Sequence, residues 1–189
     1  MFRDDLRANR PVRLQRRVIG YPLLFMKDTV TNVVVAGLGG QGVLRGTDIL
    51  AEVALRAGFD VKKSEIKGMS QRGGSVTGDV RFGRRVFSPM VPVGEADFLL
   101  VLEATQVAPT QHLLRAGGVL ITPDAIKIEE LPNKKALNVA LLGALSAHLP
   151  FSEALWLEAL REGFDDRFFE GNKAAFALGR AAEAARIKG

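Results

Sequence analysis

The residues with the clearest chemical potential are three glycines at a fixed spacing. Gly37, Gly39 and Gly42 form a GxGxxG motif between a β-branched run at 32–36 and a stretch with apolar residues at helical spacing. Glycines here allow a tight turn and a close backbone approach, and the first amides of the helix can bind a phosphate. The motif leaves three interpretations open: NAD(P) binding, binding of another phosphate-bearing ligand, or packing of the helix against the strand.

A dinucleotide site also requires an acidic residue near the end of the second strand, where it binds the ribose hydroxyls. The second predicted strand, residues 60–66, starts with Asp60, carries Lys62 and Lys63 in its middle and has Glu65 near its end. None of its acidic residues fits the ribose position well, and the two lysines would favour NADP over NAD. A free-standing NAD(P)-dependent dehydrogenase is therefore kept as the alternative function.

A second loop of unusual composition, GMSQRGGS, follows the second predicted strand. In an α/β sheet this loop lies at the carboxyl end of the strand, beside the first glycine loop, where ligands and partners bind. Its arginine offers a planar fork for a carboxylate or phosphate, and its paired glycines let another backbone approach. A mobile surface turn with a solvated arginine is the alternative interpretation. The expected contact residues of this loop are Ser70, Gln71, Arg72, Gly73, Gly74 and Ser75.

The sequence lacks the residues that most catalytic sites need. It has no cysteine, which excludes disulfides, thiolate nucleophiles and iron–sulfur clusters ligated by this chain. Its two histidines, His112 and His148, lie in predicted helical regions without metal-ligand spacing, and we expect surface or capping roles for them. No GxSxG motif or paired carboxylates supply a nucleophile or an acid–base pair. We expect no catalytic and no metal-binding residue, and a partner that carries the reactive cofactor.

The strand pattern predicts an α/β domain. Residues 32–66 form a strand–helix–strand unit whose two strands are expected to pair in parallel. Residues 76–82 alternate as a half-exposed strand, and 86–87 are expected to return as its hairpin partner. Residues 98–102 are expected to form a fully buried central strand, and 119–122 a further strand that follows a short helix.

The C-terminal part of the sequence, from Asn138 onward, has a helical pattern. Ser152 and Asn172 are placed as N-caps of segments rich in Ala and Leu, and Trp156 is expected on a buried face. The complete pattern predicts a Rossmann-like three-layer α/β domain with a mostly parallel sheet, an antiparallel hairpin and a helical C-terminus.

The net charge of +5 is concentrated near the N-terminus. Residues 1–25 hold six arginines and two aspartates, whereas residues 26–189 are nearly neutral and do not predict nucleic-acid binding. The apolar run at 18–26 is too short to cross a membrane. We expect residues 1–25 to be an N-terminal extension that is disordered or not native, or else an arm that binds a partner, and residues 26–189 to form one folded domain.

Three motifs occur in an order that is specific to one enzyme family: NVVVAGLGGQGVL at 32–44, GMSQRGGSV at 68–76 and FSPMVPVGEADFLL at 87–100. Together they resemble the gamma-type domain of the 2-oxoacid:ferredoxin oxidoreductases, and within that family the beta subunits of the indolepyruvate enzymes. The resemblance runs from about Val30 to Arg180. One departure is Lys67, where family members often have histidine.

The resemblance implies a cytoplasmic complex that decarboxylates arylpyruvates with coenzyme A, giving an aryl-acetyl-CoA, carbon dioxide and reduced ferredoxin. It implies that an alpha subunit holds thiamine diphosphate, magnesium and 4Fe-4S clusters, so that this chain alone holds no cofactor and is inactive. The gamma-type domain is expected to help form the cavity for coenzyme A or to close over the active centre. Besides the second loop, the motif positions with expected contact roles are Gly37, Gly39, Gly40, Gln41 and Gly42.

Overall fold

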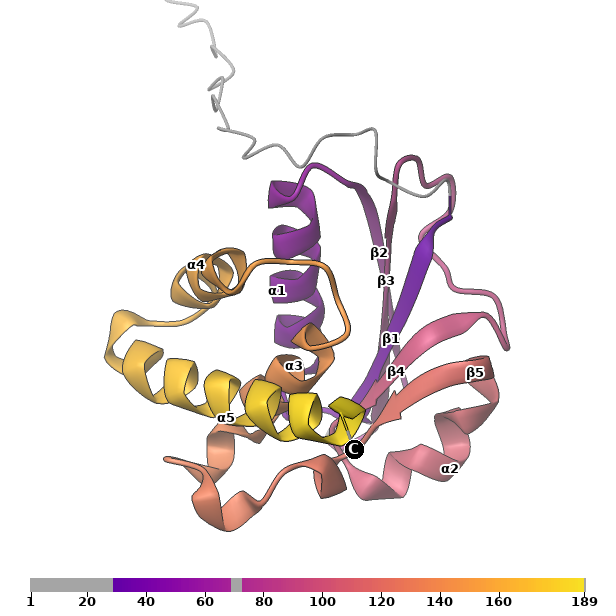
Figure 1. Ribbon diagram of the computed structural model, residues 1–189. Coiled ribbons are helices and arrows are strands. Elements are labelled where there is room, and N and C mark those ends of the chain that lie inside the picture. Colours follow the sequence, from indigo (N-terminus) through magenta and orange to yellow (C-terminus); the bar gives the residue numbers. More distant parts are fainter. Residues whose placement is uncertain (1–28, 69–72, 189) are drawn as a thin grey trace, which may run out of the picture.

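A five-stranded sheet forms the centre of the computed structural model, which describes residues 29–68 and 73–188 (Figure 1). The order across the sheet is β2-β3-β1-β4-β5; β4 is parallel to β1 and to β5, and β3 is antiparallel to β1 and β2. Four of these strands therefore point in one direction, which confirms the expected mostly parallel sheet. The strands are β1 (Thr31–Leu38), β2 (Asp60–Lys67), β3 (Ser75–Gly83), β4 (Ala96–Val101) and β5 (Leu114–Ile121).

The position of β3 corrects two predictions. Strands β1 and β2 point the same way, but β3 lies between them, so the unit at 32–66 contains no parallel pair. The antiparallel hairpin joins β2 to β3, because residues 68–74 are too few for a crossover connection. The predicted hairpin partner at 86–87 is not a strand, and the Val86 amide donates instead to the Asp60 carboxylate at 2.8 Å.

The helices form one thick layer and one thin layer. Helices α1 (Val43–Arg56), α3 (Leu137–Ser146), α4 (Glu153–Gly163) and α5 (Phe169–Lys188) lie on one side of the sheet, and the short helix α2 (Val107–Thr110) lies on the other (Figure 1). This arrangement confirms the expected α/β class with a helical C-terminus. Within the described residues, no helix is both long and apolar enough to cross a membrane.

Two predicted N-caps have different outcomes. Ser152 caps α4 as predicted, with its Oγ accepting a hydrogen bond from the Leu155 amide at 3.5 Å. Asn172 does not cap a helix, because α5 already begins at Phe169. Asn172 instead lies inside α5, where it is buried.

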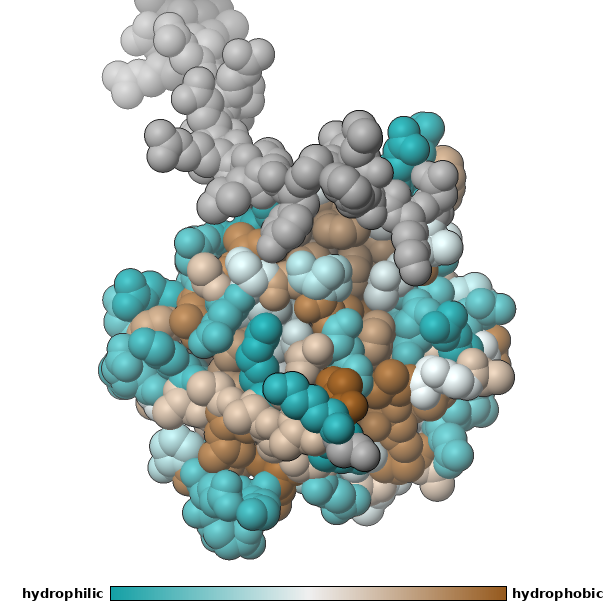
Figure 2. Space-filling model, in the orientation of Figure 1, coloured by the Kyte–Doolittle hydropathy of each residue, from teal (hydrophilic) through white to brown (hydrophobic). Residues whose placement is uncertain are grey.

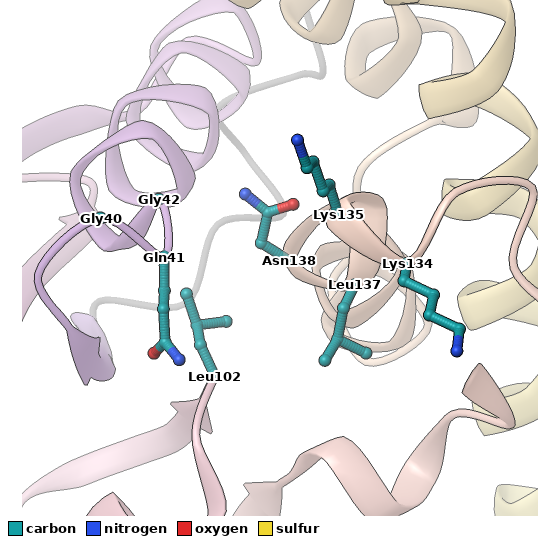
Figure 3. Close-up of a pocket in the computed structure, with 8 residues that line it drawn as sticks. All are labelled: Gly40, Gln41, Gly42, Leu102, Lys134, Lys135, Leu137 and Asn138. Atoms are coloured by element: carbon teal, nitrogen blue, oxygen red, sulfur yellow. The ribbon is translucent and has the colours of Figure 1, made fainter.

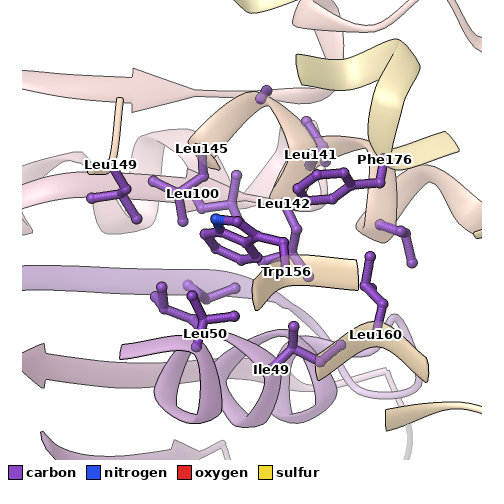
Figure 4. Close-up of a cluster of buried hydrophobic side chains, with 14 of the residues drawn as sticks. Ile49, Leu50, Leu100, Leu141, Leu142, Leu145, Leu149, Trp156, Leu160 and Phe176 are labelled. Atoms are coloured by element: carbon purple, nitrogen blue, oxygen red, sulfur yellow. The ribbon is translucent and has the colours of Figure 1, made fainter. Parts of the chain in front are cut away.

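The main hydrophobic core lies between the sheet and the thick helical layer. Trp156 is fully buried at its centre, as predicted, and Leu50, Leu142 and Phe176 surround it (Figure 4). Burial of each such side chain contributes about 1.5–3 kcal/mol. A smaller cluster on the opposite face packs under α2 and the segment that precedes β4.

Helices α3 and α5 run side by side in the same direction. Later residues of α3 contact later residues of α5. Gly143 lies against the backbone of Phe176, and the Arg180 guanidinium donates to Ser146 Oγ at 3.2 Å. Further along, His148 Nε2 lies 2.9 Å from Glu183 Oε1. The first residues of α3 and α5 are therefore held close together.

The two histidines differ from each other. His112 is exposed in a short 3-10 helix, in agreement with its predicted surface role. His148 is mostly buried, at 16% side-chain exposure, and pairs with Glu183, at 7%. The prediction of a surface or capping role for His148 is therefore wrong, because it joins the end of α3 to α5.

Candidate functional site

The structure places the two glycine loops next to each other. The Gly39 amide donates a hydrogen bond to the Gly74 carbonyl at 2.9 Å, and the Gly68 amide donates to the Ser75 carbonyl at 2.8 Å. Strand β3 brings the second loop to the first, because Ser75 at its start pairs with Leu38 at the end of β1. Of the second loop's predicted contact residues, Ser70, Gln71 and Arg72 lie outside the described residues.

The first loop requires its glycines for identifiable reasons. Gly40 and Gly42 have φ values of +95° and +88°, which side chains rarely adopt. A Cβ atom on Gly37 would lie 2.9 Å from a methyl group of Val43, so that position has no space for a side chain. This conformation of the loop therefore excludes an ordinary side chain at Gly37, Gly40 and Gly42.

The Gln41 side chain stabilises the loop by two hydrogen bonds within the protein. Its Oε1 accepts a hydrogen bond from the Leu38 amide at 2.8 Å, and its Nε2 donates to Glu103 Oε2 at 2.8 Å. Glu103 follows β4, so this side chain ties the loop after β1 to the loop after the neighbouring strand. Gln41 was expected to contact a cofactor; both polar ends of its side chain are used within the protein.

A cavity of about 430 Å³ opens beside the first glycine loop. One wall comes from Gly40, Gln41 and Gly42, and the opposite wall comes from the segment that leads into α3 (Figure 3). Asn138 lies between Gly42 and Lys135 in this view. The complete lining is Gly40, Gln41, Gly42, Leu102, Lys134, Lys135, Leu137 and Asn138.

The electrostatics of this cavity favour an anion. Helix α1 begins at its edge with Gly42 as N-cap, no capping side chain and no acidic residue in its first turn. Its first amides are thus free of side-chain acceptors, and the positive end of the helix dipole points to this region. Lys134 and Lys135 add two positive charges, and none of the described residues in the lining is acidic. The cavity is suited to phosphate groups.

The cavity wall from α3 was missed by the sequence analysis. Lys134, Lys135 and Asn138 lie far from the glycine motif in the sequence, and the spacing of residues does not show that α3 starts beside α1. A run of two lysines before a buried helix was the available signal. In the sequence alone, this pair of lysines looks the same as one on a solvated surface turn.

Neither the parallel second strand nor the acidic ribose-binding residue of a dinucleotide site lies beside the first glycine loop. Strand β3 takes the place beside β1 that the second parallel strand of a Rossmann unit occupies. Asp60 lies at the far end of β2, where hydrogen bonds from the Val86 amide and Lys62 lower its pKa. Glu65 pairs with Lys63 at 2.8 Å. The acidic residues considered for a ribose are therefore engaged elsewhere.

Comparison with known families shows which family this fold and its glycine loops belong to. Residues 32–132, more than half of the chain, match the model of the pyruvate ferredoxin/flavodoxin oxidoreductase family. The chain belongs to this family. The matched range contains both glycine loops, which are thereby identified as parts of an oxidoreductase-family domain and not of a free-standing dehydrogenase.

Individual relatives agree with this assignment. The chain is 34% identical to the indolepyruvate oxidoreductase subunit IorB of Thermococcus kodakarensis, over 78% of this chain and 93% of the relative. Its fold resembles the gamma subunit of a keto/oxoacid ferredoxin oxidoreductase from Geobacter sulfurreducens, with 25% identity and a TM-score of 0.69, over 82% of this chain and 99% of that chain.

A longer relative shows the same fold within a larger polypeptide. The 2-oxoglutarate:ferredoxin oxidoreductase of Magnetococcus marinus, whose structure holds 2-oxoglutarate, coenzyme A and succinyl-CoA, matches with a TM-score of 0.74 and 19% identity. The match covers 84% of this chain but 32% of that one. The domain fold described here thus occurs both as a separate subunit and as one part of a longer chain.

Proposed function

We propose that this chain is the beta subunit of an indolepyruvate:ferredoxin oxidoreductase. The observation that carries the proposal is the identity with the Thermococcus subunit, which extends over nearly the whole of that protein. In this role the chain takes part in the oxidative decarboxylation of an arylpyruvate with coenzyme A, yielding an aryl-acetyl-CoA, carbon dioxide and reduced ferredoxin. We expect the complex to work in the cytoplasm.

The redox chemistry belongs to a partner in this proposal. The chain contains no cysteine to ligate a cluster, and within the described residues no group of acidic or histidine side chains could hold a metal ion. We propose an alpha subunit that holds thiamine diphosphate, magnesium and 4Fe-4S clusters and that passes electrons to ferredoxin. Thiamine chemistry and electron transfer then occur in the partner, and this chain contributes a binding surface.

We propose further that the cavity beside the first glycine loop holds phosphate groups of coenzyme A. The uncapped start of α1 offers backbone amides, and Lys134 and Lys135 offer cations on the opposite wall. Gly40 leaves the approach to the backbone open, since a Cβ atom there would meet nothing within 4 Å. The structure of the Magnetococcus relative, which contains coenzyme A, supports this choice among phosphate-bearing ligands.

The first experiment is anaerobic purification of the full chain from its source cells through a C-terminal tag. We expect a larger partner with iron–sulfur absorbance and a complex that reduces a viologen dye when both indolepyruvate and coenzyme A are present. Recovery of a colourless chain without a partner, or a complex whose dye reduction needs another 2-oxoacid, would contradict the corresponding part of the proposal.

Variants of the complex test the cavity. Lys135→Met is expected to raise the KM for coenzyme A about tenfold with little change in kcat, since it removes one cation from a partly exposed phosphate contact. Lys127→Met is the matched control, because Lys127 is 79% exposed and lies outside the cavity. Equal KM values for both variants and the wild type would place the phosphate groups elsewhere.

A further inference from the structure

Strand β2 forms an open edge of the sheet, and it pairs with β3 over its whole length without a register shift. Directly after β2, the Gly68 amide donates to the Ser75 carbonyl at 2.8 Å. Because hydrogen bonding alternates along an antiparallel strand, the even-numbered residues of β2 bond to β3. The backbone N–H and C=O groups of Val61, Lys63 and Glu65 therefore point to the open side, where another strand can add.

The other edge of the sheet is irregular. Strand β5 contains Gly117 at φ +74°, and its pairing with β4 shifts register between Ala96 and Phe98. Irregularities of this kind prevent edge-to-edge association in natural sheets. Strand β2 contains no bulge, no proline and no residue with positive φ. Its lysines favour or oppose pairing according to the residue that each would face.

A groove of about 370 Å³ lies between this edge and helix α1. Its apolar residues are Ala51, Val61 and Leu55, which is 40% exposed. The acidic residues in its lining are paired, Asp48 with Lys63 and Glu52 with an arginine of the same helix. The other flank of α1 packs against α4, and hydrophilic residues gather over α4 on the molecular surface (Figure 2). The flank of α1 that faces the open edge thus carries apolar side chains and neutralised charges.

A twofold axis restricts how two copies of β2 can pair. Antiparallel strands related by such an axis place one residue opposite its own copy. An axis at Lys62, Lys63 or Glu65 would set like charges directly opposite each other, which is destabilising. An axis at Ser64 sets Lys63 opposite Glu65 of the second copy, and the symmetry repeats this pair. It also sets Lys62 opposite the exposed Ile66, whose side chain the lysine methylenes can cover.

We propose that a second copy of this chain binds at the open edge of β2, antiparallel around a twofold axis at Ser64. The two five-stranded sheets then form one continuous sheet. Helix α1 packs over β2 and β3, so the α1 helices of the two copies would lie about 10 Å apart, close to the usual distance of packed helices. Leu55 and Ala51 would be covered by this contact. The inference goes beyond the proposed function and does not depend on it.

The absence of cysteine from the sequence permits a sharp crosslinking test. Ser64→Cys introduces one thiol at the proposed axis, where the Cα atoms of a non-hydrogen-bonded pair lie about 4.5 Å apart, within reach of a disulfide. Lys62→Cys is the matched control on the same strand and the same side of the sheet. In this register the two copies of residue 62 are four residues, or about 13 Å, apart, which is too far for a disulfide.

Both variants are oxidised with copper phenanthroline, as the full chain and within the purified complex, and the products are separated by non-reducing electrophoresis. We expect at least about tenfold more disulfide-linked dimer from Ser64→Cys than from Lys62→Cys, because a bridge requires Cα atoms within about 7 Å. Lys62 is the more exposed of the two residues, so random collision in solution would favour the control instead.

A second pair of variants tests association without a crosslink. Leu55→Glu places a carboxylate beside Glu52 on the flank of α1 that faces the second copy. It should raise the dissociation constant of the dimer at least about tenfold in sedimentation equilibrium. Ile187→Glu is the matched control, because Ile187 is 53% exposed near the end of α5 and should leave the constant unchanged.

The outcomes separate this inference from the proposed function. A monomeric wild-type chain that also gives no Ser64→Cys dimer in the complex would overturn the association, as would equal crosslinking of both cysteine variants. Loss of indolepyruvate- and CoA-dependent dye reduction in the wild-type complex would instead contradict the proposed function. Ser64 Oγ donates to Asp79 at 3.3 Å, and if Ser64→Cys does not fold, the comparison of Leu55→Glu with Ile187→Glu decides.

Discussion

Replacing Gly179 with alanine is expected to destabilise the protein strongly, although alanine is the better helix former. A Cβ atom at this position would lie 2.6 Å from the carbonyl carbon of Ala140 and closer still to its oxygen. These are backbone atoms of α3, so no side-chain rotation can relieve the overlap. Helices α3 and α5 would have to separate by about 1 Å to restore ordinary carbon–carbon contact.

The magnitude follows from two opposing contributions. Alanine gains about 1 kcal/mol over glycine in a helix interior, and overpacking of a tight core contact costs about 1–3 kcal/mol, occasionally more. Since the overlap involves rigid backbone, we expect the upper part of that range to apply and a net loss of about 2 kcal/mol. For a chain of this size the melting temperature would fall by about 4–8 °C.

Gly171→Ala is the matched control in the same helix. A Cβ atom on Gly171 would meet nothing within 4 Å, so this variant should be unchanged or up to about 1 kcal/mol more stable. Thermal and urea unfolding followed by far-UV circular dichroism measure both variants. The reasoning fails if Gly179→Ala melts at or above the wild-type temperature, or if Gly171→Ala is the more damaging substitution.

Three further predictions concern single side chains. Gln41→Ala and Glu103→Ala should have non-additive effects on the free energy of unfolding, measured with urea in a double-mutant cycle. We expect a coupling energy of about 1 kcal/mol, because the two side chains are hydrogen-bonded at 2.8 Å. Strictly additive effects would exclude this hydrogen bond in solution. Burial raises the pKa of the Asp79 carboxyl. The urea midpoint of the wild type should therefore fall relative to that of Asp79→Asn as the pH rises from about 4 to 7. A difference in midpoint that stays constant over this range would contradict the prediction. Ser152→Ala should cost about 0.5 kcal/mol, near the lower limit for N-caps, because the capping bond is 3.5 Å long, and a loss above about 2 kcal/mol would indicate another role.

The sequence predicted the individual strands and helices of this fold better than the order in which the strands pair in the sheet. The strand at 32–36, the glycine loop and the following helix could be identified because β-branched runs, glycines and helical periodicity are local signals. The strand order could not, because the alternation of residues 76–82 gives no information about which strands lie beside it. The short connection at 68–74 was a usable signal for the hairpin, since a parallel pair needs a longer crossover.

The site was predicted in part for the same reason. The contact between Gly39 and Gly74 follows from two loops at one edge of a sheet, which the motifs already indicated. The opposite wall, with Lys135 and Asn138, depends on the packing of α3 and α5, which is a long-range property. Asn172 was assigned to a helix end from residue type alone, and its burial is set by the same packing.

The central place of β1 has a consequence for hydrogen exchange. Strand β1 has a hydrogen-bonded neighbour on each side, and Val33, Val34, Val35 and Ala36 are at most 1% exposed, whereas β2 and β5 lie at the two edges. Its amides should exchange only through global unfolding, and those of β2 through smaller local openings. The first glycine loop is thus attached to the slowest-exchanging strand, while its neighbour Gly74 belongs to a hairpin that ends in an edge strand. Exchange measured with and without coenzyme A would then report ligand binding chiefly through the hairpin, against a nearly invariant β1 as internal reference.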